Sequence, residues 1–287
     1  MNRQDAPVLE PQLASQFERD GLLVVRGFYD VRHDIEPIQR GIHRIIGQVM
    51  KRHGIEDRRR SFTPEAFDDG YLGLIALERA FGGEVYDAVK QLPAFIRLLG
   101  DQRHERLVMQ LRPGAIPGIA AGGFGIRIDN PNEDLYRAEW HQEYPSQLRS
   151  LDGLVFWSPL RAVTAELGPV RLLPGSHRLG PVPVWSAAGG QKSGAYALRL
   201  KDEPELLSRF QEVAPLTSPG DLVVIDFLTL HASGFNRADL PRWSVQFRYF
   251  NFDEPTGLSH GWKGSFAAGV DFRRVHPELF ADPPRDE

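Results

Sequence analysis

Two short segments that lie far apart in the sequence limit what this chain can fold into. Trp140-His141-Gln142-Glu143 supplies an imidazole and a carboxylate, and Leu230-His231-Ala232 supplies a second imidazole. His141 and Glu143 are two residues apart, which puts their side chains on one face of a β-strand but on nearly opposite sides of a helix. His231 lies far downstream, so only a folded sheet would bring all three side chains together.

These three side chains form a donor set that a metal ion could use. Two histidines and one carboxylate on one side of an ion, with the other coordination positions open, are typical of non-haem Fe(II) oxygenases. The alternative for the His141–Glu143 pair alone is a surface dipeptide and an unrelated core histidine, because short motifs also match by chance. Further features of the chain favour the metal site.

The composition is that of an ordinary soluble globular protein, and the length suits one large domain or two small ones. The chain has 287 residues, of which 41% are hydrophobic and 25% charged, and this size suffices to bury a core without disulfides. The sequence contains no cysteine, which excludes thiolate nucleophiles and cysteine-based metal sites and agrees with a cytoplasmic location. A net charge of −4 gives no reason to expect a nucleic-acid partner. We find no apolar run long enough for a membrane span and no secretory signal in residues 1–7.

The spacing of apolar residues predicts a helical front followed by short strands. Expected helices span residues 9–20, 34–52, 72–80 and 84–99, and a buried strand spans 22–28. After residue 106, strands alternate with turns that contain glycine and proline, and we expect them at 107–111, 151–160, 170–173, 222–227 and 244–252. The segment 114–125 is rich in glycine, alanine and proline, which indicates a mobile loop. This order predicts an α+β protein, mainly a β core supported by N-terminal helices.

The last expected strand alternates polar and apolar side chains. Its polar face carries Arg242, Ser244, Gln246 and Arg248, and its apolar face carries Trp243, Val245, Phe247 and Tyr249. In an ordinary antiparallel sheet the polar face would be exposed to solvent. The alternative is that the polar face lines a barrel mouth while the aromatic face packs on the helices. In that arrangement Arg242 could bind a carboxylate through its guanidinium fork, assisted by the Ser244 hydroxyl.

Five segments, in this order, resemble the phytanoyl-CoA dioxygenase (PhyH-like) family of Fe(II)/2-oxoglutarate-dependent oxygenases. They are 140–143, 173–177, 219–221, 231–236 and 242–244. They lie within residues 107–252, and residues 17–28 resemble the family's usual opening. The resemblance implies a double-stranded β-helix, which is a cupin-like jelly roll. It also implies an enzyme that uses O2 to hydroxylate or otherwise oxidise a small molecule, with release of succinate and CO2.

The resemblance further implies a role for individual residues. Iron would be held by His141, Glu143 and His231, and the distal carboxylate of 2-oxoglutarate would pair with Arg242, with Ser244 assisting. Gln110 matches a position that often touches the co-substrate, and weaker candidates for the same role are Ser233 and Gln142.

One residue departs from the family pattern, because the family usually has Asp where this chain has Glu143. The longer side chain still supplies an oxygen ligand, and this argues against halogenases, which replace the carboxylate by a small residue. Glu139 is also two residues from His141 and is the one competing carboxylate. Two other functions use the same residues: a zinc hydrolase with a metal-bound water, which gives Arg242 and Ser244 no role, and a non-catalytic cupin-type binding protein.

The whole chain, 1–287, is expected to form a single oxygenase domain. Residues 1–105 would give mostly helical support, residues 106–253 the jelly-roll core, and residues 254–287 a C-terminal tail. Residues 179–218 interrupt the strands with one short helix around 203–211 and no strong strand. An insertion of this length is typical of a lid or binding loop over a site.

Overall fold

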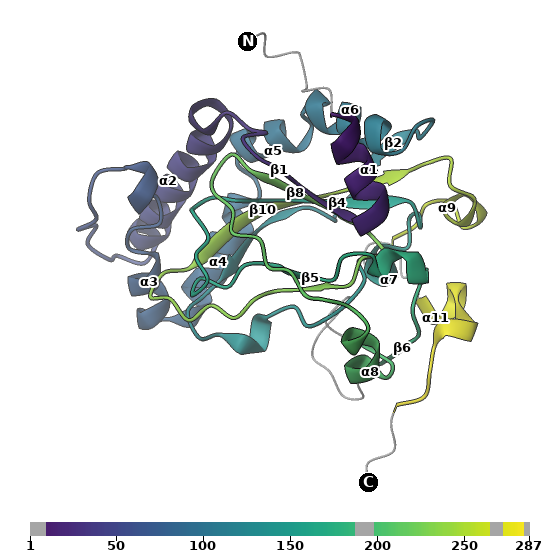
Figure 1. The fold of residues 1–287 in the computed structure, drawn as a ribbon. Coiled ribbons are helices and arrows are strands. Elements are labelled where there is room, and N and C mark those ends of the chain that lie inside the picture. Colours follow the sequence, from purple (N-terminus) through teal and green to yellow (C-terminus); the bar gives the residue numbers. More distant parts are fainter. Residues whose placement is uncertain (1–9, 187–197, 265–271, 284–287) are drawn as a thin grey trace.

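The protein consists of an antiparallel sheet with helices on one face and a smaller β layer on the other (Figure 1). The computed structural model describes residues 10–186, 198–264 and 272–283. The order of the main sheet is β1-β8-β4-β10-β2, and β3 also pairs with β10. These strands are β1 (Leu22–Val25), β2 (Pro117–Ile119), β3 (Gly125–Asp129), β4 (Gly153–Pro159), β8 (Leu222–Asp226) and β10 (Arg242–Asn251). Sequence neighbours are therefore rarely sheet neighbours.

Two short pairs of strands accompany the main sheet. One joins β5 (Arg171–Leu172) to β9 (His231–Ala232), and the other joins β6 (Val184–Ser186) to β7 (Leu198–Leu200). The pair β5–β9 matters for function because β9 carries one of the candidate ligands. Its two residues are both buried, so the backbone around His231 is held by the surrounding core.

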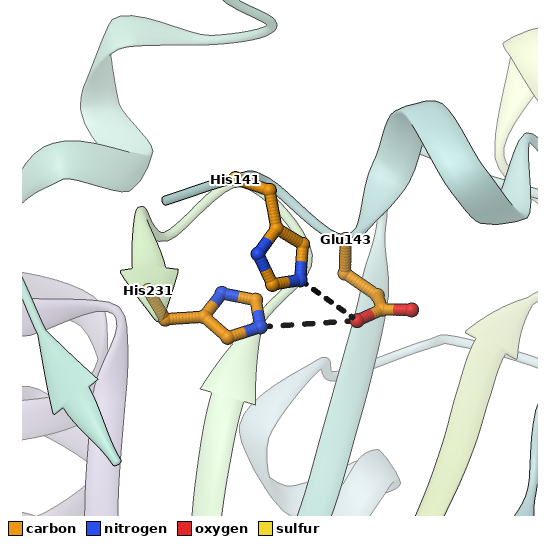
Figure 2. A group of neighbouring side chains, drawn as sticks. All are labelled: His141, Glu143 and His231. Atoms are coloured by element: carbon orange, nitrogen blue, oxygen red, sulfur yellow. Dashed lines mark ion pairs between the residues drawn. The ribbon is translucent and has the colours of Figure 1, made fainter. Parts of the chain in front are cut away.

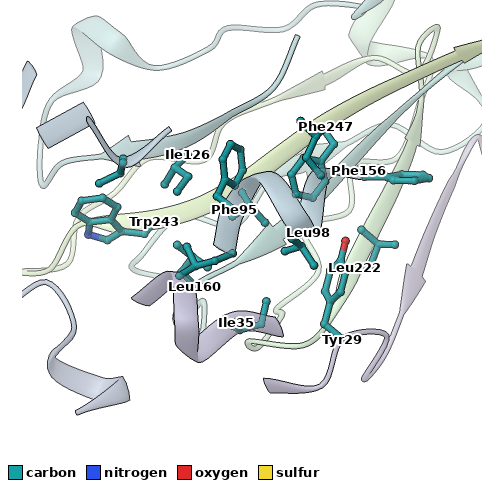
Figure 3. Close-up of a cluster of buried hydrophobic side chains, with 14 of the residues drawn as sticks. Tyr29, Ile35, Phe95, Leu98, Ile126, Phe156, Leu160, Leu222, Trp243 and Phe247 are labelled. Atoms are coloured by element: carbon teal, nitrogen blue, oxygen red, sulfur yellow. The ribbon is translucent and has the colours of Figure 1, made fainter. Parts of the chain in front are cut away.

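Helices before residue 112 cover one face of the main sheet. They are α1 (Pro11–Asp20), α2 (Glu36–Arg52), α3 (Tyr71–Leu77), α4 (Arg79–Val89), α5 (Pro93–Leu99) and α6 (Gln102–Leu111). Figure 3 shows where these helices meet β10: Phe247 lies beside Phe95 and Leu98, and Trp243 lies farther along the strand. All four side chains are buried in one apolar cluster, and burial of each large side chain contributes roughly 1.5–3 kcal/mol.

The opposite face of the main sheet forms a second apolar cluster. Val155 and Trp157 of β4 and Ile225 of β8 pack there with Leu172 and Leu230. Because β4 and β8 are covered on both faces, all of their residues are buried, which explains their nearly continuous apolar sequences. The aromatic face of β10 thus packs on the helices, and its polar face turns toward the space between the β layers. This is the second of the two arrangements that the sequence allowed for this strand.

Several expectations from the sequence are wrong, and the single helix expected at 84–99 is two helices, α4 and α5. Residues 107–111 are not a strand but the end of helix α6, which Asp101 caps by accepting the backbone N–H of Arg103. The expected loop at 114–125 contains β2 and the first residue of β3. The expected insertion at 179–218 contains the strand pair β6–β7 in addition to α8 (Glu203–Ser208). At residues 107–111, apolar residues at helical spacing and a good cap prevail over the strand interpretation of this short apolar run.

The C-terminal segment packs back onto the β layers. It contains α9 (Pro255–Ser259) and α11 (Phe272–Val275), and the hydroxyl of Tyr144 lies 2.8 Å from Nε2 of His276. Residues 187–197 lie outside the described part of the chain, and the lid expected at 179–218 stays a prediction. Within the described ranges, no helix combines the length and apolar character needed to cross a membrane.

Candidate metal centre

His141 and His231 are joined by backbone hydrogen bonds in both directions. The N–H of His141 donates to the carbonyl of His231 at 3.1 Å, and the N–H of His231 donates to the carbonyl of His141 at 3.0 Å. This isolated antiparallel bridge connects segments that are distant in sequence and brings the two imidazoles side by side, with ring centroids 4.2 Å apart (Figure 2). The folded backbone itself therefore positions the two rings.

Glu143 completes a cluster of three possible ligands. Its Oε2 lies 3.9 Å from Nε2 of His141 and 3.8 Å from Nε2 of His231 (Figure 2). One ligand atom from each residue lies within 4.8 Å of the others. His141 and Glu143 do not share a regular strand, because Glu143 has helical dihedral angles, φ −71° and ψ −33°, and precedes helix α7 (Tyr144–Gln147). The strand expected for this pair is therefore wrong, although the side chains do converge.

Hydrogen bonds to the backbone fix which nitrogen of each ring faces Glu143. Nδ1 of His141 lies 2.7 Å from the carbonyl of Glu139, and Nδ1 of His231 lies 2.9 Å from the carbonyl of Thr229. A carbonyl accepts only from a protonated nitrogen, so Nε2 of each neutral ring keeps a free lone pair. Burial lowers the pKa of both rings, and with help from the charge of His141 it lowers the pKa of His231 to about 3. Both rings are therefore neutral at physiological pH.

The other oxygen of Glu143 is occupied by hydrogen bonds. Oε1 accepts from Nε2 of Gln147 at 3.0 Å, from Nε of Arg248 at 3.1 Å and from Oγ of Ser146 at 3.3 Å. Burial by itself would raise the pKa of Glu143, but the charge of Arg248 is the largest opposing effect, and this pKa is lowered to about 2. The cluster thus offers two neutral imidazoles and one ionised carboxylate, which is a donor set that fits Fe(II).

A cavity of about 380 Å³ adjoins the cluster. The three candidate ligands line it together with Gly122–Gly125, Trp157 and Arg248. Its volume falls within the range of roughly 300–1,000 Å³ that is usual for small-molecule sites. The cluster therefore faces a space in which further ligands of a metal and a small molecule could bind.

Arg242 and Ser244 lie on the polar face of β10 but do not line this cavity. The guanidinium of Arg242 is 1% exposed and donates to Oδ2 of Asp129, from Nε at 3.2 Å and from Nη2 at 2.8 Å. Nη1 of Arg242 and Oγ of Ser244 are buried and have no hydrogen-bond partner among the described residues. Such orphaned polar atoms are costly, and a carboxylate bound between them would satisfy both. These residues therefore fit 2-oxoglutarate.

The remaining candidates lie in different surroundings. Ser233 is buried and lines the cavity. The side chain of Gln142 is bonded to backbone groups of Gly180, Val182 and Leu228, and so ties neighbouring segments together. Gln110 lies in helix α6 and does not line the cavity.

Glu139, the competing carboxylate, points elsewhere. Its Oε2 lies 3.0 Å from Nε of Arg199, and its side chain is 40% exposed. Only its backbone carbonyl contacts the site, through Nδ1 of His141. Among the described residues, the group of ligands that could hold a metal ion contains Glu143 and not Glu139.

Reasoning from sequence missed the contribution of Arg248 and Gln147. Arg248 was recognisable as part of the polar face of its strand, but its contact with Glu143 depends on the pairing of β10 with β4, where Arg248 lies opposite Val155. Gln147 is four residues after Glu143, a spacing that brings side chains together only if a helix starts there.

The chain resembles known proteins in sequence and in fold. The profile of a family described as phytanoyl-CoA dioxygenase (PhyH) matches residues 17–244. The epimerase SnoN from nogalamycin biosynthesis, solved with Fe3+, alpha ketoglutarate and nogalamycin RO, has a TM-score of 0.52 and 20% identity, and the match covers 91% of each chain. EctD from S. alaskensis, solved with 2-oxoglutarate and 5-hydroxyectoine, has a TM-score of 0.56 and 18% identity over 98% of this chain and 90% of that one.

A third structure, AviO1 from Streptomyces viridochromogenes Tue57, has a TM-score of 0.52 and 16% identity over 88% of this chain and 99% of that one. No curated protein sequence matches the chain. At such low identity the three structures show a likeness of fold, and this likeness confirms the cupin-like jelly-roll core.

Proposed function

Because the chain belongs to the phytanoyl-CoA dioxygenase family of Fe(II)- and 2-oxoglutarate-dependent oxygenases, we propose that His141, Glu143 and His231 hold its iron. The observation that carries this proposal is the convergence of the three side chains, with one ligand atom of each within 4.8 Å of the others. The membership of the family argues against a zinc hydrolase and against a binding protein without activity. In the zinc hydrolase Arg242 and Ser244 would have no part.

Each ligand has a defined task in this proposal. His141 and His231 offer the lone pairs of Nε2, and Glu143 offers the negative charge of Oε2. Because the three ligand atoms would lie on one side of the ion, the coordination positions on its other side would stay open toward the cavity. Bound iron, 2-oxoglutarate and O2 together supply the oxidising chemistry, in which 2-oxoglutarate is converted to succinate and CO2.

We propose that Arg242 and Ser244 bind the distal carboxylate of 2-oxoglutarate. The two orphaned donors, Nη1 of Arg242 and Oγ of Ser244, support this assignment. Asp129 would hold the rest of the guanidinium in place, because it already accepts from Nε and Nη2. Ser233, which lines the cavity together with the candidate metal ligands, would contact the same ligand.

The substrate in this proposal is a small molecule. The cavity volume of about 380 Å³ supports a substrate of modest size. We also propose a cytoplasmic enzyme that does not bind nucleic acid. The absence of cysteine from the sequence and a net charge of −4 favour these two assignments.

Anaerobic titration of the purified protein with Fe(II) and then with 2-oxoglutarate tests the proposed function. Chelation of the iron by the keto acid should give a weak visible charge-transfer band. Binding of the metal without such a band, at saturating 2-oxoglutarate, would instead support the zinc hydrolase. Succinate production in the presence of O2 provides a second measurement that does not require knowledge of the substrate.

A further inference from the structure

We propose that Arg248 keeps Glu143 attached to the metal through one oxygen only, and so preserves a coordination position that 2-oxoglutarate needs. This inference rests on the proposed function, because it assumes that Glu143 is a ligand. It goes beyond that function by giving Arg248 a positioning role that neither the family motif nor the ligand cluster assigns.

The two oxygens of Glu143 have very different surroundings. Oε2 faces the two histidines, whose Nε2 atoms lie 3.8 and 3.9 Å away. Oε1 accepts from Gln147, Arg248 and Ser146 at 3.0, 3.1 and 3.3 Å, whereas Oε2 accepts one longer hydrogen bond, from Nη2 of Arg248 at 3.4 Å. The protein therefore engages the two oxygens unequally, and Oε2 is the one more available to a metal.

Arg248 is the donor that fixes the orientation of the Glu143 carboxylate relative to the two histidines. Gln147 belongs to the short helix α7 that begins directly after Glu143, so it moves with the carboxylate. Arg248 comes instead from the main sheet, where it lies opposite Val155 of β4. Its guanidinium is fixed further, since Nη2 donates to Gln246 at 3.0 Å. A hydrogen bond from a cation to a carboxylate is also roughly twice as strong as one between neutral groups.

The length of Glu143 makes this restraint necessary. Glutamate has one more rotatable bond than the usual aspartate, so its carboxylate can rotate and offer both oxygens to one ion. A facial site with three protein donors has three open positions, two for the keto acid and one for O2. A second oxygen from Glu143 would fill one of them. An oxygen that accepts three hydrogen bonds is a poorer metal donor than one that accepts a single hydrogen bond at 3.4 Å, so Oε1 stays out of the coordination sphere.

The variant Arg248→Met tests this inference on the full chain, since it removes the charge and keeps similar bulk. We expect Fe(II) to bind as tightly as in the wild type or more tightly, because a competing cation has gone. In the absence of 2-oxoglutarate, near-infrared magnetic circular dichroism and X-ray absorption should report one more oxygen ligand from the protein. The affinity of the iron-loaded variant for 2-oxoglutarate should fall by roughly 10- to 100-fold, as for other residues around metal ligands.

Two variants serve as controls. Arg237→Met removes an arginine of the same size whose guanidinium pairs with Asp134 at 2.6 Å and has no contact with Glu143. It should behave as the wild type in all three measurements. Arg248→Lys keeps the charge and should restore much of the affinity for 2-oxoglutarate. If Arg248→Met does not fold, as judged by circular dichroism, Arg248→Gln takes its place.

The possible outcomes distinguish failure of the inference about Arg248 from failure of the proposed function. An unchanged set of iron ligands in Arg248→Met would overturn the inference even if 2-oxoglutarate bound less tightly, because Arg248 would then contact the co-substrate directly. Loss of iron from Arg248→Met would also overturn it, because Arg248 would then be needed to hold the metal itself. A wild-type protein that bound no iron would instead contradict the proposed function, and the inference would fall with it.

Discussion

Arg242 and Asp129 lie directly opposite each other on strands β10 and β3, and their side chains form an ion pair with Nη2 2.8 Å from Oδ2. The pair is buried, and Arg127 shares the same carboxylate at 2.7 Å. Burial would raise the pKa of Asp129, but the charges of Arg127 and Arg242 outweigh it and lower this pKa to about 2. Asp129 therefore stays ionised and holds the guanidinium of Arg242 in one orientation.

The first prediction concerns Arg242→Lys. A lysine keeps the counter-ion for Asp129 but lacks the second nitrogen that we assign to 2-oxoglutarate. Truncating a buried charged partner costs about 2–5 kcal/mol, so the affinity for 2-oxoglutarate should fall by roughly 30- to 5,000-fold while iron binding is unchanged. Calorimetric titration of the iron-loaded protein measures this. Arg161→Lys, at a partly buried arginine that pairs with Asp68 at 2.8 Å, should leave the affinity unaltered.

The second prediction distinguishes the two carboxylates near His141. Glu143→Ala should lose iron and all 2-oxoglutarate turnover, because two histidines alone leave the charge of the ion uncompensated. Glu143→Asp keeps the charge and should retain partial activity. Glu139→Ala should keep full iron content, since its side chain pairs with Arg199 and not with the histidines. Metal analysis of the three purified proteins decides, and the reverse pattern for Glu139 and Glu143 would refute the assignment.

The third prediction concerns pH and His104, which is fully buried beside Tyr29, with Nε2 2.7 Å from the hydroxyl. Burial lowers the pKa of His104 to about 4, so on acidification the unfolded chain takes up the proton first. Neutral His104 makes its full contribution to the free energy of unfolding above about pH 6.5. This contribution, about 3 kcal/mol, is lost as the pH falls through about 4.

His104→Gln should be less stable at pH 7 but should lose less stability between pH 7 and 4. Urea unfolding at several pH values measures the difference in slope between the variant and the wild type. This difference does not depend on any constant loss of packing at the mutated position. Parallel curves would show that His104 does not contribute to acid sensitivity.

The fourth prediction tests the core between β10 and the helices. Phe247 is fully buried and stacks on Phe95, with ring centroids 5.6 Å apart. Phe247→Ala should reduce the free energy of unfolding by about 3–5 kcal/mol, because it removes a large side chain and leaves a cavity. Phe252→Ala, at a residue of the same type that is 36% exposed, should cost roughly 1 kcal/mol. Denaturant unfolding of both variants measures this, and equal losses would contradict the assigned core.

Much of the fold could be predicted where one physical signal dominates. The apolar runs that became β4 and β8 and the helical stripe of α2 were identified because burial determines them directly. Residues 107–111 were assigned incorrectly because Leu107, Val108 and Leu111 suit both a strand and a helix. The cap at Asp101 was the local signal that favoured the helix. The strand β3 was missed because it follows a run of glycines and depends on pairing with β10.

The ligand types could be predicted from the sequence, but their geometry could not. His141, Glu143 and His231 were named from spacing and motif resemblance. The backbone that brings them together is a bridge between distant segments, followed at once by a helical turn at Glu143. Neither feature produces a periodic pattern of residues in the sequence. The contact of Arg248 with Glu143 likewise depends on strand register, which a single sequence specifies only through the complete fold.

At the proposed iron site, the bridge between His141 and His231 would also link iron to folding. Because this bridge joins two segments that are distant in sequence, the unfolded chain can offer the ion little more than the isolated His141–Glu143 pair. A ligand that binds only the folded state stabilises it by mass action, by about 2.7 kcal/mol when its free concentration is 100 times its Kd. The thermal midpoint of this protein should therefore follow the supply of free Fe(II), so that iron starvation would shorten the lifetime of the folded chain as well as stop its catalysis.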